Sequence, residues 1–251
     1  MNRYFRLPRP VIFAHRGASA HAPENTLAAF SLALQHGADG IELDAKLSSD
    51  GEVVVMHDAT LKRTTGVEGK IAERTLKEIK QLDAGKWKGE TFAGEPVPTL
   101  REVFSSLGGK LLINVELTNY GHGGDGLVGK VIALVHEFQL EENILFSSFS
   151  PGNIALARKL APEIPAALLA WKGWFGGFSR SRWMMNISPH GLHPFRTDVT
   201  TQLIEREKQR NRFINVWTVN EPHEMKRLFG LGVDGIFTDD PRLARQVMEE
   251  L

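Results

Sequence analysis

The chain has 251 residues, a length that suits one α/β barrel, and its 42% hydrophobic and 24% charged residues are typical of a soluble globular protein. Thirty basic residues balance thirty acidic ones, so no overall field favours nucleic acid as a partner. The absence of cysteine excludes disulfides, thiolate metal sites and cysteine nucleophiles.

The N-terminal region has only a short apolar run after Pro10. A secretory signal needs a longer apolar core, and a membrane span needs about 20 apolar residues. We therefore expect a soluble, cytoplasmic protein without a transmembrane segment. The sequence leaves its oligomeric state open.

Short apolar runs alternate with amphipathic segments along the chain. The predicted strands lie at residues 11–14, 39–43, 111–117, 144–149, 166–170, 191–194, 214–219 and 235–238. The predicted helices lie at residues 26–36, 100–107, 127–138, 154–160, 202–208 and 222–229. Continuous apolar strands between helices indicate a parallel sheet covered by helices. Eight such units in this length predict a single (β/α)8 TIM-barrel domain over residues 1–251.

Residues 45–95 form an insertion after the second strand, too long for an ordinary loop of a barrel. Its Ser49-Asp50-Gly51 sequence is a strong turn signal, and an apolar run ending at His57 follows. We expect a hairpin that leaves the end of the second strand and brings His57 back toward it.

Residues 171–185 (WKGWFGGFSRSRWMM) follow the fifth predicted strand and combine aromatic residues with glycine and arginine. One interpretation is a partly buried loop with a short helix. The alternatives are a lid over an apolar group of the substrate, or a surface that makes weak contact with lipid.

Catalytic groups of barrel enzymes lie at the C-terminal ends of the strands, and three acidic residues have this position. Glu42 and Asp44 are two residues apart, so they face the same side of a strand, and Glu116 is on the next strand. Converging carboxylates are tolerated most easily around a divalent cation, and oxygen ligands suit Mg²⁺ or Ca²⁺. A single acidic residue on a strand is more often a solvated strand end or an ion-pair partner.

Two histidines are candidates for acid-base catalysis. His15 follows the first strand and His57 ends the predicted hairpin. The imidazole pKa near 6.5 suits both proton donation and proton acceptance, although a single histidine is more often a packing or capping residue. We assign packing or capping to His21, His36, His122, His136, His190 and His223, and His193 fits either interpretation.

Five motifs occur in order along nearly the whole chain. They are AHRGASAHAPENTLAAF (14–30), GIELDAKLSSDGEVVVMHD (40–58), VPTLREVF (97–104), VWTVNEP (216–222) and GVDGIFTDDP (232–241). In this combination the sequence resembles the glycerophosphodiester phosphodiesterase family. The resemblance implies a phospholipase-C-like barrel, an enzyme of the phosphoric diester hydrolase class, and one Mg²⁺ or Ca²⁺ ion. It also implies hydrolysis of glycerophosphodiesters, in lipid and glycerol metabolism, to glycerol 3-phosphate and an alcohol.

The resemblance also implies a role for each matching residue. His15 and His57 would be the catalytic acid and base, without an assignment of which is which. Arg16 would contact phosphate, and Trp217 would lie against the glycerol moiety. The metal ligands would be Glu42, Asp44 and Glu116.

One position departs from the family pattern. The family usually has lysine two residues after the third carboxylate, where this chain has Thr118. Threonine donates one hydrogen bond but carries no charge, and loss of such a group costs roughly 3 kcal/mol of transition-state stabilisation. We predict that Lys172, just past the fifth strand, compensates by binding the substrate.

Several alternatives remain open at this stage. The attacking oxygen is that of water or of the substrate's own glycerol hydroxyl. The aromatic segment motivates a lysophospholipase-D-like or sphingomyelinase-D-like lipid phosphodiesterase on the same scaffold. Thr118 motivates a non-catalytic phosphodiester-binding protein, whereas the ordered motifs argue against an unrelated metal-dependent lyase or aldolase.

Overall fold

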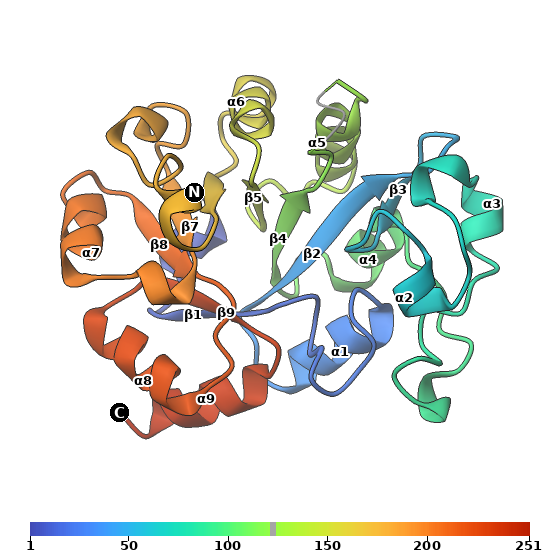
Figure 1. Cartoon of the computed structure of the whole chain (residues 1–251), viewed down its shortest axis with the longest axis horizontal. Helices are drawn as coiled ribbons and strands as arrows, with labels where there is room; N and C mark the ends of the chain where they lie inside the picture. Colours follow the sequence, from blue (N-terminus) through green and yellow to red (C-terminus); the bar gives the residue numbers. More distant parts are fainter. Residues whose placement is uncertain (121–123) are drawn as a thin grey trace.

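The computed structural model describes residues 1–120 and 124–251, and its centre is a closed barrel of parallel strands (Figure 1). The pairing of β1 with β2 closes the ring, which confirms the predicted TIM barrel. The eight parallel strands, in chain order, are β1 (Val11–Ala14), β2 (Gly40–Leu47), β4 (Leu112–Leu117), β5 (Ile144–Ser148), β6 (Ala166–Ala170), β7 (Gly191–Pro194), β8 (Phe213–Val216) and β9 (Gly235–Thr238).

The longer helices surround these strands (Figure 1). They are α1 (Leu27–Gln35), α4 (Leu100–Leu107), α5 (Leu127–Glu137), α6 (Pro151–Leu160), α7 (Thr201–Lys208), α8 (Pro222–Leu231) and α9 (Pro241–Glu249). Helix α9 was not among the predicted helices. Its start was readable, because Asp240 accepts a hydrogen bond from the Leu243 amide and Pro241 occupies the first turn. None of the helices in the described ranges is both long and apolar enough to cross a membrane.

The predicted hairpin after the second strand is confirmed. β2 extends to Leu47, beyond the predicted end at Leu43, because its last residues pair with antiparallel β3 (Val53–Val55). Ser48 donates a hydrogen bond to Asp50 Oδ1 at 2.6 Å and so helps to hold the turn. The hairpin returns the chain toward the mouth of the barrel, where His57 follows.

The rest of the insertion has a small core of its own. It includes short helices α2 (Lys62–Thr65) and α3 (Leu76–Ile79), and the 3₁₀ turns Ile71–Glu73 and Glu90–Phe92. This core contains Met56, Leu61, Ile71, Ile79 and Ala84, together with Val54 of β3 and Val97 just after the insertion. The loop that carries His57 is therefore supported by packed side chains.

The N-terminal turn Arg3–Arg6 covers the end of the barrel where the strands begin, and its Tyr4 packs with residues near the strand starts. Tyr4 is completely buried, its hydroxyl donates to Asn215 Oδ1 at 2.8 Å, and its ring packs with Phe13 and Phe213. At Gly40 a β-carbon would lie 2.7 Å from the Phe13 ring, so glycine makes room for this packing. This apolar packing leaves the opposite end of the barrel to polar side chains.

Candidate active site

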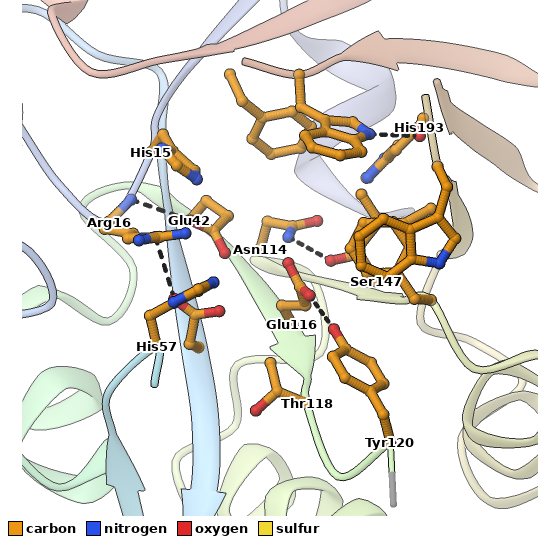
Figure 2. A pocket seen from close by; sticks show the side chains of 16 residues that line it. His15, Arg16, Glu42, His57, Asn114, Glu116, Thr118, Tyr120, Ser147 and His193 are labelled. Atoms are coloured by element: carbon orange, nitrogen blue, oxygen red, sulfur yellow. Dashed lines mark hydrogen bonds and ion pairs between the residues drawn. The ribbon is translucent and has the colours of Figure 1, made fainter. Parts of the chain in front are cut away.

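A cavity of about 250 Å³ opens at the C-terminal ends of the strands (Figure 2). Seven of the eight predicted site residues line it, which are His15, Arg16, Glu42, Asp44, His57, Glu116 and Trp217. Lys172 is outside the set of described residues that line the cavity. The other lining residues are Asn114, Thr118, Tyr120, Ser147, Phe149, Leu169, Trp171, His193 and Phe237.

Three acidic side chains converge on the floor of this cavity. Strands β2 and β4 pair in a register that sets Asp44 opposite Glu116, and Glu42 lies two residues earlier on the same face. One carboxylate oxygen from each residue lies within 4.8 Å of the others. Glu42 and Asp44 are only 4% and 1% exposed, so water screens them little.

The cluster holds more negative charge than its surroundings neutralise. Burial, with the nearby charges of Asp44 and Glu116, raises the pKa of Glu42 well above its ordinary value. Burial and the charge of Asp44 raise the pKa of Glu116 to about 8, against the opposing effects of Tyr120 and Arg16. Repulsion of this kind is relieved either by protonation or by a bound cation.

Local hydrogen bonds orient each carboxylate. The Arg16 amide donates to Glu42 Oε2 at 3.0 Å, and Asn25 Nδ2 donates to Asp44 Oδ2 at 2.8 Å. The Tyr120 hydroxyl donates to Glu116 Oε1. The three carboxylates are therefore held in fixed directions by their neighbours.

The residues of the cluster fit a hard divalent cation. The nearby Asn114 Oδ1 is a buried acceptor that also lines the cavity, and it has no hydrogen-bond partner among the described residues. Carboxylate and amide oxygens are the ligands that Mg²⁺ and Ca²⁺ prefer. The donor set and its unneutralised charge both favour such an ion.

A tight turn after β1 presents His15 and Arg16 to the cavity. Arg16 and Gly17 have φ values of 56° and 84°, in the left-handed region. A β-carbon at Gly17 would lie 2.7 Å from the Ala29 β-carbon, so only glycine fits there. Arg16 adopts a backbone conformation that is unfavourable for its type, as is common at functional sites.

Asp239 orients His15. Its Oδ1 lies 2.7 Å from His15 Nδ1, and it also accepts hydrogen bonds from Ser19 and from Asn220. Burial opposes the charge of Asp239, but the contacts with His15, Asn220 and Ser19 lower its pKa to about 2. A carboxylate at Nδ1 favours the proton on that nitrogen, so Nε2 is the atom left to exchange a proton with substrate.

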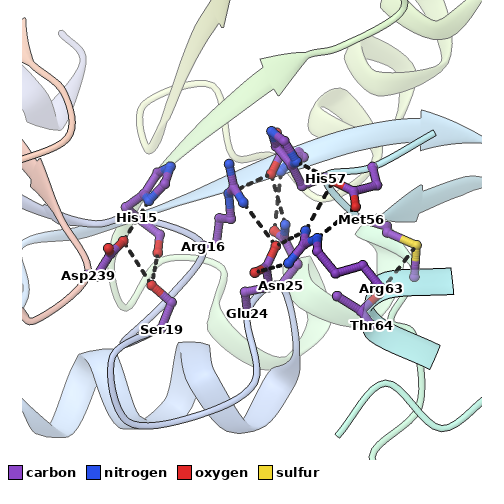
Figure 3. A network of polar contacts seen from close by, with 12 residues as sticks. His15, Arg16, Ser19, Glu24, Asn25, Met56, His57, Arg63, Thr64 and Asp239 are labelled. Carbon is purple, nitrogen blue, oxygen red and sulfur yellow. Dashed lines mark hydrogen bonds and ion pairs between the residues drawn. The ribbon is translucent and has the colours of Figure 1, made fainter. Parts of the chain in front are cut away.

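Asp58 holds His57 in the same way. Its Oδ1 lies 2.7 Å from His57 Nδ1, and the Arg63 guanidinium donates to both of its oxygens. The hydrogen bond from Arg63 is the main cause that lowers the pKa of Asp58 to about 2. Arg63 also donates to Glu24, which connects this loop to the loop after β1 (Figure 3).

Arg16 is a fixed cation between the two histidines (Figures 2 and 3). Its Nη1 donates to Glu24 at 3.0 Å, and its Nε lies 3.5 Å from Asp44 Oδ2. Burial disfavours the charge, but Asp44, Glu24 and Glu42 outweigh this effect and raise the pKa of Arg16.

Aromatic side chains form another wall of the cavity. Trp171 stacks on Phe149 with ring centroids 4.0 Å apart, and Trp217 meets Phe149 edge-on at 5.4 Å. Trp217 Nε1 donates to the His193 carbonyl at 2.8 Å, which fixes the indole. His193 is completely buried, and burial lowers the pKa of its imidazole to about 3, so it is neutral at physiological pH.

The structure places a different lysine beside Thr118 from the one predicted. Lys172 Nζ lies 5.5 Å from the centroid of the Phe195 ring. Lys46 Nζ donates to Thr118 Oγ1 at 2.6 Å, and that hydroxyl donates to the Ala45 carbonyl at 2.7 Å. Lys46 lies on the same face of β2 as Glu42 and Asp44, because the three are separated by two residues each.

Of the remaining histidines in the described residues, only His193 lines the cavity. The prediction for His122 lies outside the described residues. His21 contacts Asp240 at 2.8 Å and His136 contacts Glu141 at 2.8 Å. His190 accepts a hydrogen bond from the Ala166 amide.

Comparison with known proteins gives the family. Residues 15–243 match the model of the glycerophosphoryl diester phosphodiesterase family. The chain belongs to this family. A glycerophosphodiester phosphodiesterase of Caldanaerobacter subterraneus is 41% identical, with 93% of this chain and 95% of that protein covered. One of Bacillus altitudinis is 37% identical over 96% of this chain and 98% of its own.

Solved structures of family members have the same barrel. A phosphodiesterase of Oleispira antarctica in complex with the product sn-glycerol-3-phosphate matches with a TM-score of 0.86 and 32% identity, over 99% of this chain and 100% of that one. A glycerophosphodiester phosphodiesterase of Thermotoga maritima matches with a TM-score of 0.77 and 28% identity, over 96% and 99%. These comparisons confirm the resemblance found in the sequence and the prediction of a phosphoric diester hydrolase.

Several residues of the site were not predicted from the sequence. Asp58 and Asp239 both lie in the motifs quoted above. Their places in the sequence were therefore known, but their hydrogen-bond partners were not. Glu24 and Asn25 lie in the first motif. No pattern in the sequence indicated a role for Arg63, because its contacts with Asp58 and Glu24 depend on the fold of the insertion.

Proposed function

We propose that this chain hydrolyses glycerophosphodiesters to glycerol 3-phosphate and an alcohol, with one Mg²⁺ or Ca²⁺ held by Glu42, Asp44 and Glu116. The observation that carries the proposal is the pair of histidines, His15 and His57, each fixed through Nδ1 by its own carboxylate beside a cluster of three acids. The named activity of the Caldanaerobacter relative and the product bound in the Oleispira structure support it.

The phosphate group of the substrate carries one negative charge. Glu42, Asp44 and Glu116 would hold the divalent cation, which would supply positive charge to neutralise the phosphate of the substrate. Arg16 donates to the same phosphate from the side of the histidines. Because Glu24 and Asp44 hold the guanidinium in place, Arg16 needs little reorganisation energy to bind the phosphate.

His15 and His57 move the protons. One imidazole is neutral and takes a proton from the attacking hydroxyl, and the other is protonated and gives one to the leaving alkoxide. Both exchange protons at Nε2, since Nδ1 of each ring is turned to a carboxylate. The attacking hydroxyl is that of water or of the substrate's glycerol. A cyclic phosphate trapped at early times would identify the glycerol hydroxyl.

Trp217 binds the glycerol moiety with its indole face. The ring is fixed by the hydrogen bond from its Nε1 to the His193 carbonyl and by edge contact with Phe149. The apolar wall excludes water from the side of the cavity opposite Arg16, which strengthens charge interactions with the phosphate.

Lys46 supplies the cation that is missing at Thr118. Lys46 is outside the set of described residues that line the cavity, but its ammonium donates to Thr118 Oγ1, which does line it, and lies in the field of Asp44 and Glu116. Lys172 is the second candidate. It ranks below Lys46 because its side chain would have to rotate away from Phe195 to reach the substrate. Lys46→Ala should reduce turnover strongly, Lys172→Ala should reduce it less, and Thr118→Lys in the Lys46→Ala background should restore it.

The activity is tested with a panel of glycerophosphodiesters, with and without chelator, by assay of glycerol 3-phosphate. We expect product release that stops on chelation and returns with Mg²⁺ or Ca²⁺. Binding of the substrates without turnover at saturating Mg²⁺ and Ca²⁺ would contradict the proposal and favour a non-catalytic binding protein.

A lysophospholipase-D-like activity is the second candidate. The stacked pair Phe149 and Trp171 lines the cavity and gives an apolar surface for the lipid portion of a lysophospholipid. Turnover of lysophosphatidylcholine and glycerophosphocholine, measured side by side, separates the two. A higher kcat/KM for the lysolipid would make it the principal substrate.

A further inference from the structure

Residues 171–185, between β6 and β7, expose five large aromatic side chains, of which Trp171, 52% exposed, also lines the active-site cavity. Trp174 and Trp183 are each 82% exposed, Phe175 is 69% exposed and Phe178 is 63% exposed. Large apolar side chains gathered on one surface segment mark a contact site for a protein or a lipid. Trp174 and Phe175 touch each other, with ring centroids 4.4 Å apart, and otherwise point to solvent.

Apart from Trp171, which stacks on Phe149, the aromatic side chains are not what holds the segment in place. Arg180 donates to the carbonyls of Trp171 and Gly173 at 3.0 and 2.6 Å and pairs with Asp198 at 2.8 Å. Met184 and Met185 are buried and anchor the far end of the segment. The backbone is therefore fixed by an arginine, an aspartate and two methionines, and the exposed rings remain available for a partner.

The charge of the segment is of one sign. Lys172, Arg180 and Arg182 lie among residues 171–185, which contain no aspartate or glutamate. Lys172 and Arg182 are exposed, whereas Arg180 is used in the internal contacts. Exposed aromatic rings next to exposed basic groups complement the headgroup region of an anionic bilayer.

The segment begins in the wall of the active-site cavity. Trp171 lines the cavity and stacks on Phe149, and Trp174 follows three residues later in solvent. A membrane bound to these rings would therefore lie beside the cavity mouth. A glycerophosphodiester is the polar part of a phospholipid, so this placement brings the site to the source of its substrate class.

We propose that residues 171–185 bind the surface of an anionic lipid bilayer, with Trp174, Phe175, Phe178 and Trp183 at interfacial depth and Arg182 against the headgroups. The purpose of this docking rests on the proposed phosphodiesterase function, but the docking itself does not. Tryptophan and phenylalanine suit this depth, because their rings are apolar and the indole N–H remains wet.

The test is sedimentation of the full chain with vesicles of phosphatidylcholine alone or mixed with phosphatidylglycerol. We expect binding that increases with phosphatidylglycerol and falls with salt. The triple variant Trp174→Ser, Phe175→Ser, Trp183→Ser should lose at least about tenfold in partition coefficient. Val67→Ser, an exposed apolar residue of the insertion, is the matched control and should bind as the wild type does.

The electrostatic part has its own variant. Arg182→Ser should weaken binding to mixed vesicles severalfold, on the order expected for one basic residue near a charged surface, and leave binding to phosphatidylcholine unchanged. Lys77→Ser removes an exposed lysine of α3 and should have no effect on either.

The outcomes separate the surface from the activity. Absence of vesicle binding by the wild type, or equal binding by the triple variant, would overturn the proposal, whatever the turnover of soluble glycerophosphodiesters. A wild-type dimer that dissociates in the triple variant, without vesicle binding, would show that the rings cover a second copy of this chain and would also overturn it. Lipid binding with no turnover would leave the docking surface intact and refute only the enzymatic proposal.

Discussion

Replacement of Glu116 by glutamine should stabilise the metal-free protein at high pH. Burial and the charge of Asp44 raise the pKa of Glu116 to about 8 from an ordinary value near 4.5. Below pH 4.5 the carboxyl is protonated in the folded and unfolded chain alike, so it has no charge-related cost. As the pH rises from 4.5 to 8, the unfolded chain releases the proton first, and the folded state loses stability; above pH 8 the loss is complete.

The size of this loss follows from the pKa. A difference between about 4.5 and about 8 corresponds to ~5 kcal/mol at most, and local relaxation reduces the expected gain of the variant to ~3 kcal/mol. In a chain of 251 residues this corresponds to roughly 10 °C in the unfolding midpoint. Glutamine keeps the shape of the side chain and an oxygen that accepts from Tyr120, so the change isolates the charge.

The assay is thermal unfolding in the presence of chelator at pH 5 and pH 9. The midpoint of Glu116→Gln should exceed that of the wild type at pH 9, and the difference should be much smaller at pH 5, where most of the loss has not yet occurred. Glu163→Gln, at an exposed position, is the control and should shift neither midpoint. Addition of Mg²⁺ or Ca²⁺ should reverse the order, because only the wild type keeps all three carboxylates. A variant that is less stable than the wild type with chelator at pH 9 would refute the reasoning.

Three further predictions concern activity. His15→Ala and His57→Ala should each lower kcat by roughly 10²–10⁴-fold and reduce the bell-shaped pH–rate profile to one limb; full activity in either variant would remove that residue from catalysis. Asp239→Asn should lower kcat by roughly 10–100-fold with little change in KM, because His15 loses its orienting carboxylate, and a change confined to KM would contradict this role. Lys46→Ala should lower kcat/KM by on the order of 10²-fold, with recovery on addition of Thr118→Lys, whereas failure to recover in a folded double variant would remove Lys46 from phosphate binding.

The barrel was predictable because its strands are buried on both faces. The runs at 11–14, 166–170, 191–194 and 235–238 were placed at their observed bounds, since an apolar run with turn signals at both ends leaves little freedom. The convergence of Glu42 and Asp44 followed from the two-residue period of a strand alone.

The contacts between distant segments were not predictable. Asp239 reaches His15 only because β9 pairs with β1, a relation that requires the closed barrel. The position of Lys46 beside Thr118 was not predicted, because the second strand was expected to end at Leu43. Pairing with β3 extends β2 to Leu47, and only this extension fixes the face of the strand on which Lys46 lies. Lys172 stays a prediction, because its place after a strand does not fix the direction of a long side chain.

The central claim is that Glu42, Asp44 and Glu116 together hold one divalent cation, and calorimetric titration of the chelator-treated chain with Mg²⁺ and with Ca²⁺ tests it most directly. We predict a single site for at least one of the two ions in the wild type, and loss of that site in Glu42→Gln, in Asp44→Asn and in Glu116→Gln. Unchanged cation binding in all three variants would contradict the claim, as would a wild-type protein that binds neither ion.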